Sequence, residues 1–177
     1  MPRFSPDACQ VQATTPIYDK GDYIIEITNY APFAYSGDVR DNNGKPTGEK
    51  KDVYGCRYSA KLVGKFGKDG SFDDELNGED VSSIRMYWHN DASRASTKRF
   101  FMAALGYDRN SEAEFNEDFW NDTDFSIDCD DDYENVTAGE SWQAPVSKLV
   151  RVSLDKEIYN GNEQQKFGYF DLANQKK

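Results

Sequence analysis

Hydrophobic and polar residues alternate along two stretches between residues 53 and 88. In the first stretch, VYGCRYSAKLV, the hydrophobic positions are Tyr54, Cys56, Tyr58, Ala60 and Leu62. In the second, VSSIRMYW, they are Ile84, Met86 and Trp88. Because successive side chains of a strand point to opposite faces, each stretch is predicted to form a strand with one hydrophobic face. If the two strands pair, their other faces present one outer surface with Arg57, Lys61, Arg85 and Tyr87.

The remaining strand signals lie on both sides of this region. They are an alternating stretch at 21–30, a weaker one at 124–129 and a closing hairpin over 148–172. The hairpin is predicted to turn at Asn160-Gly161, a dipeptide typical of two-residue hairpin turns. Residues 31–52 form either a long loop or a hairpin, with a turn signal at Asn43-Gly44. A connection of this length, with aromatic rings beside lysines, favours a binding function.

Two helices are predicted after the second of the long strands. In HNDASRASTKRFFMAALG the hydrophobic spacing changes to a helical stripe that includes Phe100 and Phe101, and Gly106 is placed to end the helix. Ser111 and Glu114 have the spacing of a capping box, which predicts a second, short helix that ends near Trp120.

Taken in order, the elements are three strands, a helix and a closing hairpin. This order predicts a mainly β fold, an OB-like five-stranded Greek-key barrel with a helix between strands 3 and 4 and a short extra helix. At 177 residues the chain is long enough for one domain with its own core. We expect a flexible N-terminal arm at 1–20, a single OB-like domain at 21–172 with an acidic insertion at 107–140, and a C-terminal tail at 173–177.

The net charge of −11 is concentrated in one segment. Residues 107–140 contain thirteen acidic residues and one basic residue, Arg109, so the rest of the chain is close to neutral. Eight Lys and Arg residues fall between residues 40 and 68. A local positive surface can therefore coexist with the negative total, which keeps nucleic acid among the expected ligands.

Other classes of protein receive little support. No hydrophobic run approaches the length of a membrane span, and the first residues do not resemble a signal peptide, so we expect no membrane association and a place in the cytoplasm, here that of a host cell. Cys9, Cys56 and Cys129 are an odd number at wide spacing, which suits a reducing compartment. Two Asn-x-Thr matches, at Asn121 and Asn135, are then chance matches.

Candidate catalytic and metal-binding residues are few. His89 is the single histidine, which excludes a site with several histidine ligands, and no nucleophile motif accompanies it. The acidic run from Asp128 to Glu134 has oxygens for a hard cation, but Tyr133 stands where an EF-hand loop needs glycine. We therefore expect no enzyme, no resident metal and no cofactor. A hydrolase or nuclease remains a minor alternative.

Aromatic and basic residues give the strongest functional signal. In an OB fold, ligands lie across strands 2 and 3 and between the loops that join strands 1 and 2 and strands 4 and 5. Rings in such positions stack on bases and cations hold phosphates. The predicted nucleic-acid-binding residues are Tyr30, Phe33, Tyr35, Lys50, Lys51, Arg57, Lys61, Lys65, Arg85, Tyr87 and Lys166.

Three segments together resemble a family of small phage proteins encoded among replication and recombination genes. They are GDYIIEI, the helix TKRFFMAALGYD and the hairpin VRVSLDKEIYNGNEQQKFGYF, so the resemblance extends over about residues 21–171. It implies an OB-like barrel and a role in binding single-stranded DNA or in assisting recombination. Phage proteins of this kind often end in an acidic tail that recruits partners, whereas the acidic block of this chain is internal.

The sequence thus predicts a non-enzymatic single-stranded DNA-binding protein that acts in phage DNA replication or recombination. Its other expected partners are phage or host replication and recombination proteins, bound through the acidic segment, and homo-oligomerisation stays open. The alternative is a protein-interaction module or DNA mimic that uses residues 107–140 to bind a host or phage protein. The first hypothesis predicts a basic functional surface, and the alternative predicts an acidic one.

Overall fold

The computed structural model describes residues 15–173. Its strands are β1 (Gly21–Arg40), β2 (Pro46–Phe66), β3 (Phe72–Asp73), β4 (Asp80–Tyr87), β5 (Ile127–Cys129), β6 (Val136–Ala138), β7 (Leu149–Tyr159) and β8 (Asn162–Leu172). Its helices are α1 (Asp91–Leu105) and α2 (Glu112–Asp118), with short 3-10 helices at Trp120–Asp122 and Glu140–Gln143. The prediction of a mainly β fold with two helices is confirmed.

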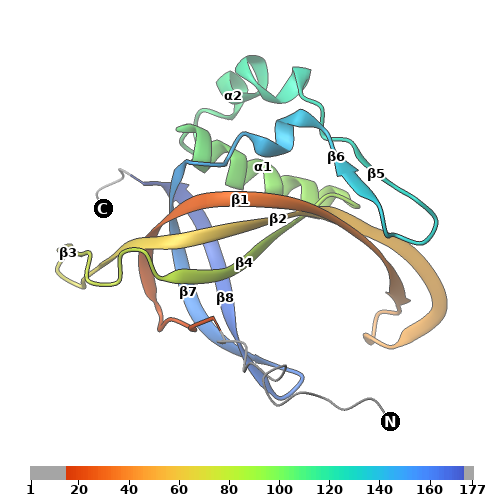
Figure 1. Cartoon of the computed structure of the whole chain (residues 1–177), viewed down its shortest axis with the longest axis horizontal. Helices are drawn as coiled ribbons and strands as arrows, with labels where there is room; N and C mark the ends of the chain where they lie inside the picture. Colours follow the sequence, from red (N-terminus) through yellow and green to blue (C-terminus); the bar gives the residue numbers. More distant parts are fainter. Residues whose placement is uncertain (1–14, 174–177) are drawn as a thin grey trace, which may run out of the picture.

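One antiparallel sheet organises the molecule (Figure 1). β1 lies between β2 and β7, β2 also pairs with β4 and with the short β3, and β7 pairs with β8. The five longer strands therefore follow the order β4, β2, β1, β7, β8, and β4 and β8 are its two ends. Within residues 15–173 these two ends do not pair, so the sheet does not close into a barrel.

Residues 31–52 form the outer part of a long hairpin. The sequence had predicted either a loop or a hairpin for this segment. β1 and β2 are 20 and 21 residues long and pair from Tyr23 opposite Lys65 to Arg40 opposite Pro46. Gly44 has φ of +77° in the turn, as the Asn43-Gly44 signal predicted. In Figure 1 the far half of this hairpin curves away from the helices. The hairpin thus extends the sheet well beyond the core.

The core lies between the sheet and α1. Cys56 and Tyr58 of β2 and Ile84 of β4 are buried, as the alternation predicted, and the Tyr58 hydroxyl donates a hydrogen bond to the Trp142 carbonyl at 2.6 Å. Tyr54, expected among the core residues, is only half-buried. Its ring contacts His89 with centroids 6.3 Å apart.

The first predicted helix is confirmed, and so is its predicted end at Gly106. The Asn90 side chain accepts a hydrogen bond from the Ser93 amide at the start of α1, and Gly106, with φ of +90°, ends it. α2 is confirmed as a short helix, but its predicted capping box is wrong. Ser111 makes no side-chain cap, because its hydroxyl donates to Asp108 at 3.1 Å instead.

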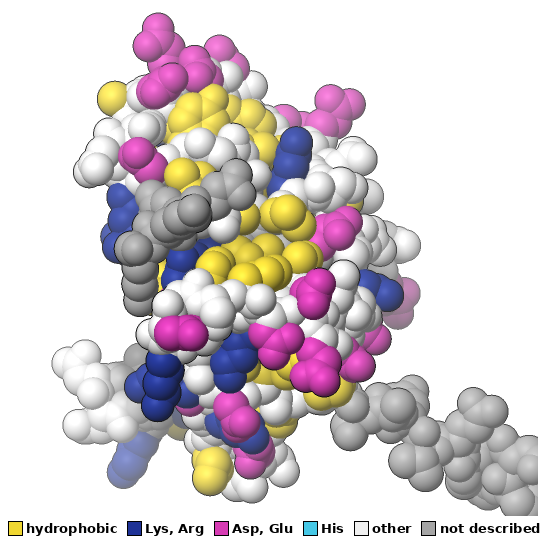
Figure 2. All heavy atoms as spheres, turned by 90° about the vertical axis from the view of Figure 1, so that its left-hand side faces the viewer, with side chains coloured by type: hydrophobic (Ala, Val, Ile, Leu, Met, Phe, Trp, Pro, Cys, Tyr) yellow, Lys and Arg dark blue, Asp and Glu magenta, His cyan; other side chains and the backbone are white. Residues whose placement is uncertain are grey.

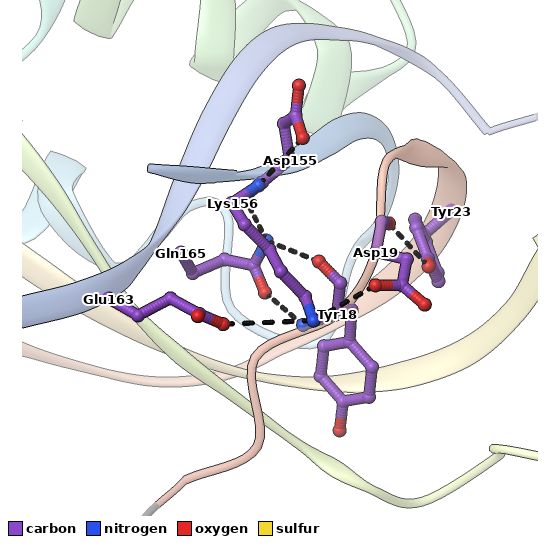
Figure 3. A network of polar contacts seen from close by, with 7 residues as sticks. All are labelled: Tyr18, Asp19, Tyr23, Asp155, Lys156, Glu163 and Gln165. Atoms are coloured by element: carbon purple, nitrogen blue, oxygen red, sulfur yellow. Dashed lines mark hydrogen bonds and ion pairs between the residues drawn. The ribbon is translucent and has the colours of Figure 1, made fainter. Parts of the chain in front are cut away.

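Hydrogen bonds of Tyr18 join the two ends of the sheet, and Figure 3 shows those on the β7–β8 side. The Tyr18 amide donates to Oε1 of Gln165 on β8 at 2.7 Å, and Nε2 of Gln165 donates to the carbonyls of Tyr18 at 3.2 Å and Asp155 at 2.6 Å. The Tyr18 hydroxyl donates to the Asp80 carbonyl on β4 at 2.8 Å. The ring, only 8% exposed, therefore fills one end of the seam between β4 and β8.

The limits of the folded part differ from those expected. Lys156 Nζ forms ion pairs with Asp19 at 2.9 Å and Glu163 at 3.7 Å, so the segment around Tyr18 is attached to the β7–β8 hairpin. The expected arm at 1–20 thus includes residues that belong to the folded domain, whereas 1–14 lie outside the described residues. The same holds for 174–177 of the expected C-terminal tail.

The acidic insertion at 107–140 folds over a cluster of aromatic side chains. Phe101 of α1 contacts six other rings, which are Tyr58, Phe100, Phe119, Trp120, Phe125 and Trp142. At the tip of the β5–β6 hairpin, the Tyr133 hydroxyl donates to Asp52 of β2. In Figure 1 the insertion lies on the helix side of the sheet. Figure 2 shows its acidic side chains gathered over α2, with hydrophobic side chains exposed below them.

Candidate nucleic-acid interface

Three aromatic rings meet on the face of the sheet that points away from α1. Phe33 of β1 and Tyr87 of β4 both pair with Gly55 of β2, which lies between them. Because Gly55 has no side chain, the two rings approach edge to face across β2, with centroids 5.5 Å apart. Tyr35 stacks beside Phe33 with a centroid distance of 6.1 Å, and its ring is 42% exposed. The sheet thus presents a small aromatic surface to solvent.

Two arginines lie next to these rings on the same face. Arg57 of β2 is directly opposite Arg85 of β4, and both side chains are exposed. Within residues 15–173 neither guanidinium forms a salt bridge. Like charges directly opposite each other destabilise an antiparallel pair, by up to about 1 kcal/mol. An anion placed between the two guanidinium groups would remove this repulsion.

Lys61 and Lys51 extend this face along β2 in opposite directions. The extra residues at the register shifts beside Ser59 lie on β1 and β4, so β2 itself alternates regularly from Lys51 to Lys61, and both lysines share the face of Arg57. Lys61 is opposite Glu26 on β1 and Asp80 on β4, and these carboxylates partly compensate its charge. We call Phe33, Tyr35, Arg57, Arg85 and Tyr87 the aromatic–basic face, with Lys51 and Lys61 at its margins.

Four of the predicted binding residues do not join this face. Tyr30 pairs with Tyr58, and its ring stacks on that core residue with centroids 6.4 Å apart. Lys50 points to the other side of the hairpin, where it forms an ion pair with Asp38. The Lys65 ammonium lies 5.3 Å from the centroid of Tyr23, and Lys166 is on β8, at the far end of the sheet. Seven of the eleven predicted residues therefore lie on this face or at its margins.

One residue near the face was missed by sequence reasoning. Tyr159, at the turn between β7 and β8, is 62% exposed. Burial raises the pKa of the Tyr35 hydroxyl, Tyr87 raises it further, Arg85 acts in the opposite direction, and Tyr159 makes the smallest contribution. In Figure 1 the β7–β8 turn lies on the side of the sheet opposite the helices, as does the aromatic–basic face. The Asn160-Gly161 dipeptide predicted this turn. Tyr159 precedes it, in the loop between the last two strands of the predicted barrel. Because an OB fold binds ligands beside this loop, the ring was a signal that could have identified Tyr159.

His89 lies at the edge of the aromatic–basic face. Its ring contacts Tyr87 with centroids 5.7 Å apart and Tyr54 at 6.3 Å. Burial lowers the pKa of His89, and the positive charge of Lys51 lowers it further. A hydrogen bond with the Tyr54 backbone acts in the opposite direction. The folded protein therefore favours the neutral imidazole, which suits a ring packed among aromatic side chains.

We expect the pKa of His89, measured by NMR titration, to lie below 6.5, and Lys51→Gln to raise it. Because the sequence has one histidine, its ring signals need no assignment. Since the unfolded chain binds the proton more tightly, stability is fully present above about pH 6.5 and falls as the pH is lowered through this range. The control is Lys148→Gln, which removes the same charge at an exposed position far from His89 in the sequence. A pKa above 6.5, or no response to Lys51→Gln, would contradict the geometry.

No group of three or more His, Cys, Asp or Glu side chains within 15–173 is arranged to hold a metal ion. In the acidic run, the carboxylate of Asp130 instead accepts hydrogen bonds from the Glu134 amide at 2.9 Å and from Asn135 Nδ2 at 2.7 Å. These bonds use the carboxylate to shape the β5–β6 loop. Across the same part of the chain, no helix is both long and apolar enough to cross a membrane.

Neither protein-family models nor curated proteins match this chain in sequence. The functional argument therefore depends on the geometry of the site itself.

Proposed function

We propose that this chain is a non-enzymatic protein that binds single-stranded DNA on the aromatic–basic face, in phage DNA replication or recombination. The observation that carries the proposal is the pair Arg57 and Arg85. Two exposed guanidinium groups face each other without an acidic partner in the described structure, next to three rings. Guanidinium groups bind phosphates, and aromatic rings stack on bases of any identity.

The strand order supports an OB-like interpretation. In an OB fold the first three strands form a meander, a helix follows the third, and a closing hairpin pairs with the first strand. Here β1, β2 and β4 form the meander, α1 follows β4, and β7 pairs with β1. The ligand face of an OB fold lies on its second and third strands, and OB barrels are often partly open. The aromatic–basic face occupies the corresponding strands β2 and β4.

The two flanking hairpins fit the same function. In Figure 1 the β1–β2 turn and the β7–β8 turn both lie on the side of the sheet opposite the helices. A strand of DNA that follows the face would place phosphates at Arg57 and Arg85 and bases on Tyr35 and Tyr87. Each stacked base contributes roughly 1 to 3 kcal/mol, so a few rings and two cations are enough for micromolar binding.

The test is a titration of the protein into fluorescein-labelled oligothymidine, followed by anisotropy and repeated with duplex DNA. We expect binding at low salt, much weaker binding to duplex, and an affinity that falls between about 50 and about 200 mM salt. The His89 ring signals should shift on addition of the oligonucleotide, because this ring contacts Tyr87. No binding at low salt, or equal binding to duplex, would refute the proposal.

One observation favours the alternative, a protein-interaction module. Of the thirteen acidic side chains at 107–140, all except Asp108 are exposed, and they lie on the opposite side of the sheet from the aromatic–basic face. The alternative predicts that replacing Asp128, Asp131 and Asp132 by asparagine abolishes function. Under the DNA-binding proposal the same variant binds DNA at least as well. Asp130 is left intact because it shapes the loop.

A further inference from the structure

Tyr133 fastens the acidic insertion to the β1–β2 hairpin. Its hydroxyl, at the tip of the β5–β6 hairpin, donates a hydrogen bond to Oδ1 of Asp52 on β2. This bond raises the pKa of Tyr133, and the side chain of Ser36 on β1 acts in the opposite direction. Ser36 and Asp52 are partners in the register of the two strands. Tyr133 therefore interacts with both strands, and in Figure 1 the β5–β6 hairpin lies beside the outer curve of β2.

The hydrogen bond lies directly behind the aromatic–basic face. Ser36 and Asp52 point to the helix side of the sheet, where they meet Tyr133. Their neighbours in the chain, Tyr35 and Lys51, point to the other side, because successive residues of a strand alternate between faces and the register here has no shift. The same short part of the hairpin is thus held on one side and presents binding residues on the other.

No further strand pairs with this part of the hairpin in the described structure. β4 pairs with β2 only as far as Gly55, and β7 pairs with β1 only as far as Glu26. The ion pair of Lys50 with Asp38 joins the two strands of the hairpin to each other. A two-stranded ribbon without further packing is only marginally stable in water. A contact from outside the hairpin, such as that of Tyr133, therefore determines how firmly this part is held.

Tyr133 has an unfavourable backbone conformation. Its φ of +58° lies in the left-handed region, which a bulky residue rarely adopts. The surrounding loop is fixed by Asp130, whose carboxylate accepts hydrogen bonds from the Glu134 amide and the Asn135 side chain. Strain of this kind persists only where the surrounding structure fixes it, and it occurs most often at functional positions. The strain and the hydrogen bond to Asp52 together indicate a function for this side chain.

We propose that Tyr133 is a positioning residue of the DNA-binding site. It holds the outer part of the β1–β2 hairpin against the acidic insertion, so that Tyr35 and Lys51 stay in place for an incoming strand of DNA. A site that is already ordered binds more tightly, because less conformational entropy is lost on binding. The inference depends on the proposed function of the aromatic–basic face. It links the acidic insertion to DNA binding without a direct contact between the insertion and the DNA.

The first test compares Tyr133→Phe with Tyr107→Phe. Each variant loses one hydroxyl that donates to a carboxylate, but Tyr107 donates to Asp118 within the insertion, at 2.8 Å. Hydrogen–deuterium exchange of residues 31–52 in the free protein reports how firmly the hairpin is held. We expect Tyr133→Phe to accelerate this exchange at least about threefold, and Tyr107→Phe to leave it unchanged. Asp52→Asn should keep the slow exchange because its amide oxygen still accepts the bond, whereas Asp52→Ala should resemble Tyr133→Phe.

Titrations of oligothymidine measure the consequence for binding. Tyr133→Phe should bind about three- to tenfold more weakly than the unmodified protein, at nearly the same melting temperature. In a background of Tyr35→Ala with Lys51→Gln, the same substitution should have less than about a twofold effect, because it acts through these two residues. Unchanged exchange, or an equal loss of affinity in both backgrounds, would overturn the inference. Binding that Tyr133→Phe leaves intact would refute this inference alone, whereas no binding by the unmodified protein would refute the proposed function as well.

Discussion

Reversing both arginines of the aromatic–basic face, Arg57→Glu with Arg85→Glu, is expected to weaken oligothymidine binding at least about 100-fold, because two phosphate contacts become two repulsions. The affinity of the double variant should also depend less steeply on salt concentration than that of the unmodified protein. Each phosphate contact to a single strand contributes about 0.7 to the slope of log K against log salt, so the slope should decrease by about 1.4. Anisotropy titrations at several salt concentrations measure both quantities.

The matched control is Lys20→Glu with Lys148→Glu, which changes the net charge equally at two exposed positions outside this face. Its affinity should decrease only slightly, through the general field of the protein. If the control loses as much affinity as the arginine variant, binding is not located at Arg57 and Arg85.

A single substitution separates binding from stability. Arg85→Glu places a carboxylate opposite Arg57, so it replaces a like-charge pair by an opposite-charge pair across β2 and β4. Such a pair stabilises an antiparallel sheet by roughly 0.2 to 1 kcal/mol. The variant should therefore melt at the same or a higher temperature and yet bind DNA less well. This combination would show that the arginine pair is retained for a ligand rather than for the fold.

Most of the sheet could be predicted because its alternation is regular. The extra residues at the register shifts beside Ser59 lie on β1 and β4 and leave the alternation of β2 intact, so the sequence pattern alone placed Arg57 and Lys61 on one face and Tyr58 in the core. The same pattern in β4 placed Arg85 and Tyr87 correctly. The pairing of these two strands was only a condition at the level of the sequence, and the structure shows it, with Arg57 opposite Arg85.

The predicted binding residues that lie away from the aromatic–basic face do so for physical reasons. Tyr30 was grouped with Phe33 and Tyr35 because residues 31–52 were read as a loop or hairpin without a defined face. Because β1 continues to Arg40, its odd- and even-numbered residues in this part lie on opposite faces of the sheet. Tyr30 lies on the core face, opposite Tyr58. Lys65 was assigned by its proximity in sequence, but it lies near the end of β2, beside Tyr23.

Features that depend on distant segments could not be predicted. Tyr18 fills the seam only because β4 and β8 approach each other without pairing, and its stretch has no periodic pattern. A groove of about 580 Å³ likewise forms only where α1, β4 and β8 come together. Local periodicity reports which side of an element is buried. It does not report which elements meet.

The largest effect on stability is expected at Gly55. A Cβ atom at this position would lie 2.0 Å from the Met86 carbonyl oxygen and 2.9 Å from the Tyr87 Cα atom. These are backbone atoms of β4, so no side-chain rotation relieves the clash, and β4 must move away from β2. Gly55→Ala is therefore expected to lower the free energy of unfolding by more than about 4 kcal/mol, which is exceptional for so small a change. Urea denaturation followed by tryptophan fluorescence measures the loss.

Ser59→Ala is the control, because Ser59 is exposed on the same strand and face, and its effect should stay within about 0.5 kcal/mol. Gly55 also determines the aromatic surface, since Phe33 and Tyr87 meet only across a position without a side chain. Any Gly55→Ala protein that remains folded should then bind DNA less well than Ser59→Ala. Native stability and unchanged binding for Gly55→Ala would mean that β4 does not approach β2 this closely. The ring contact between Phe33 and Tyr87 would then lose its physical basis.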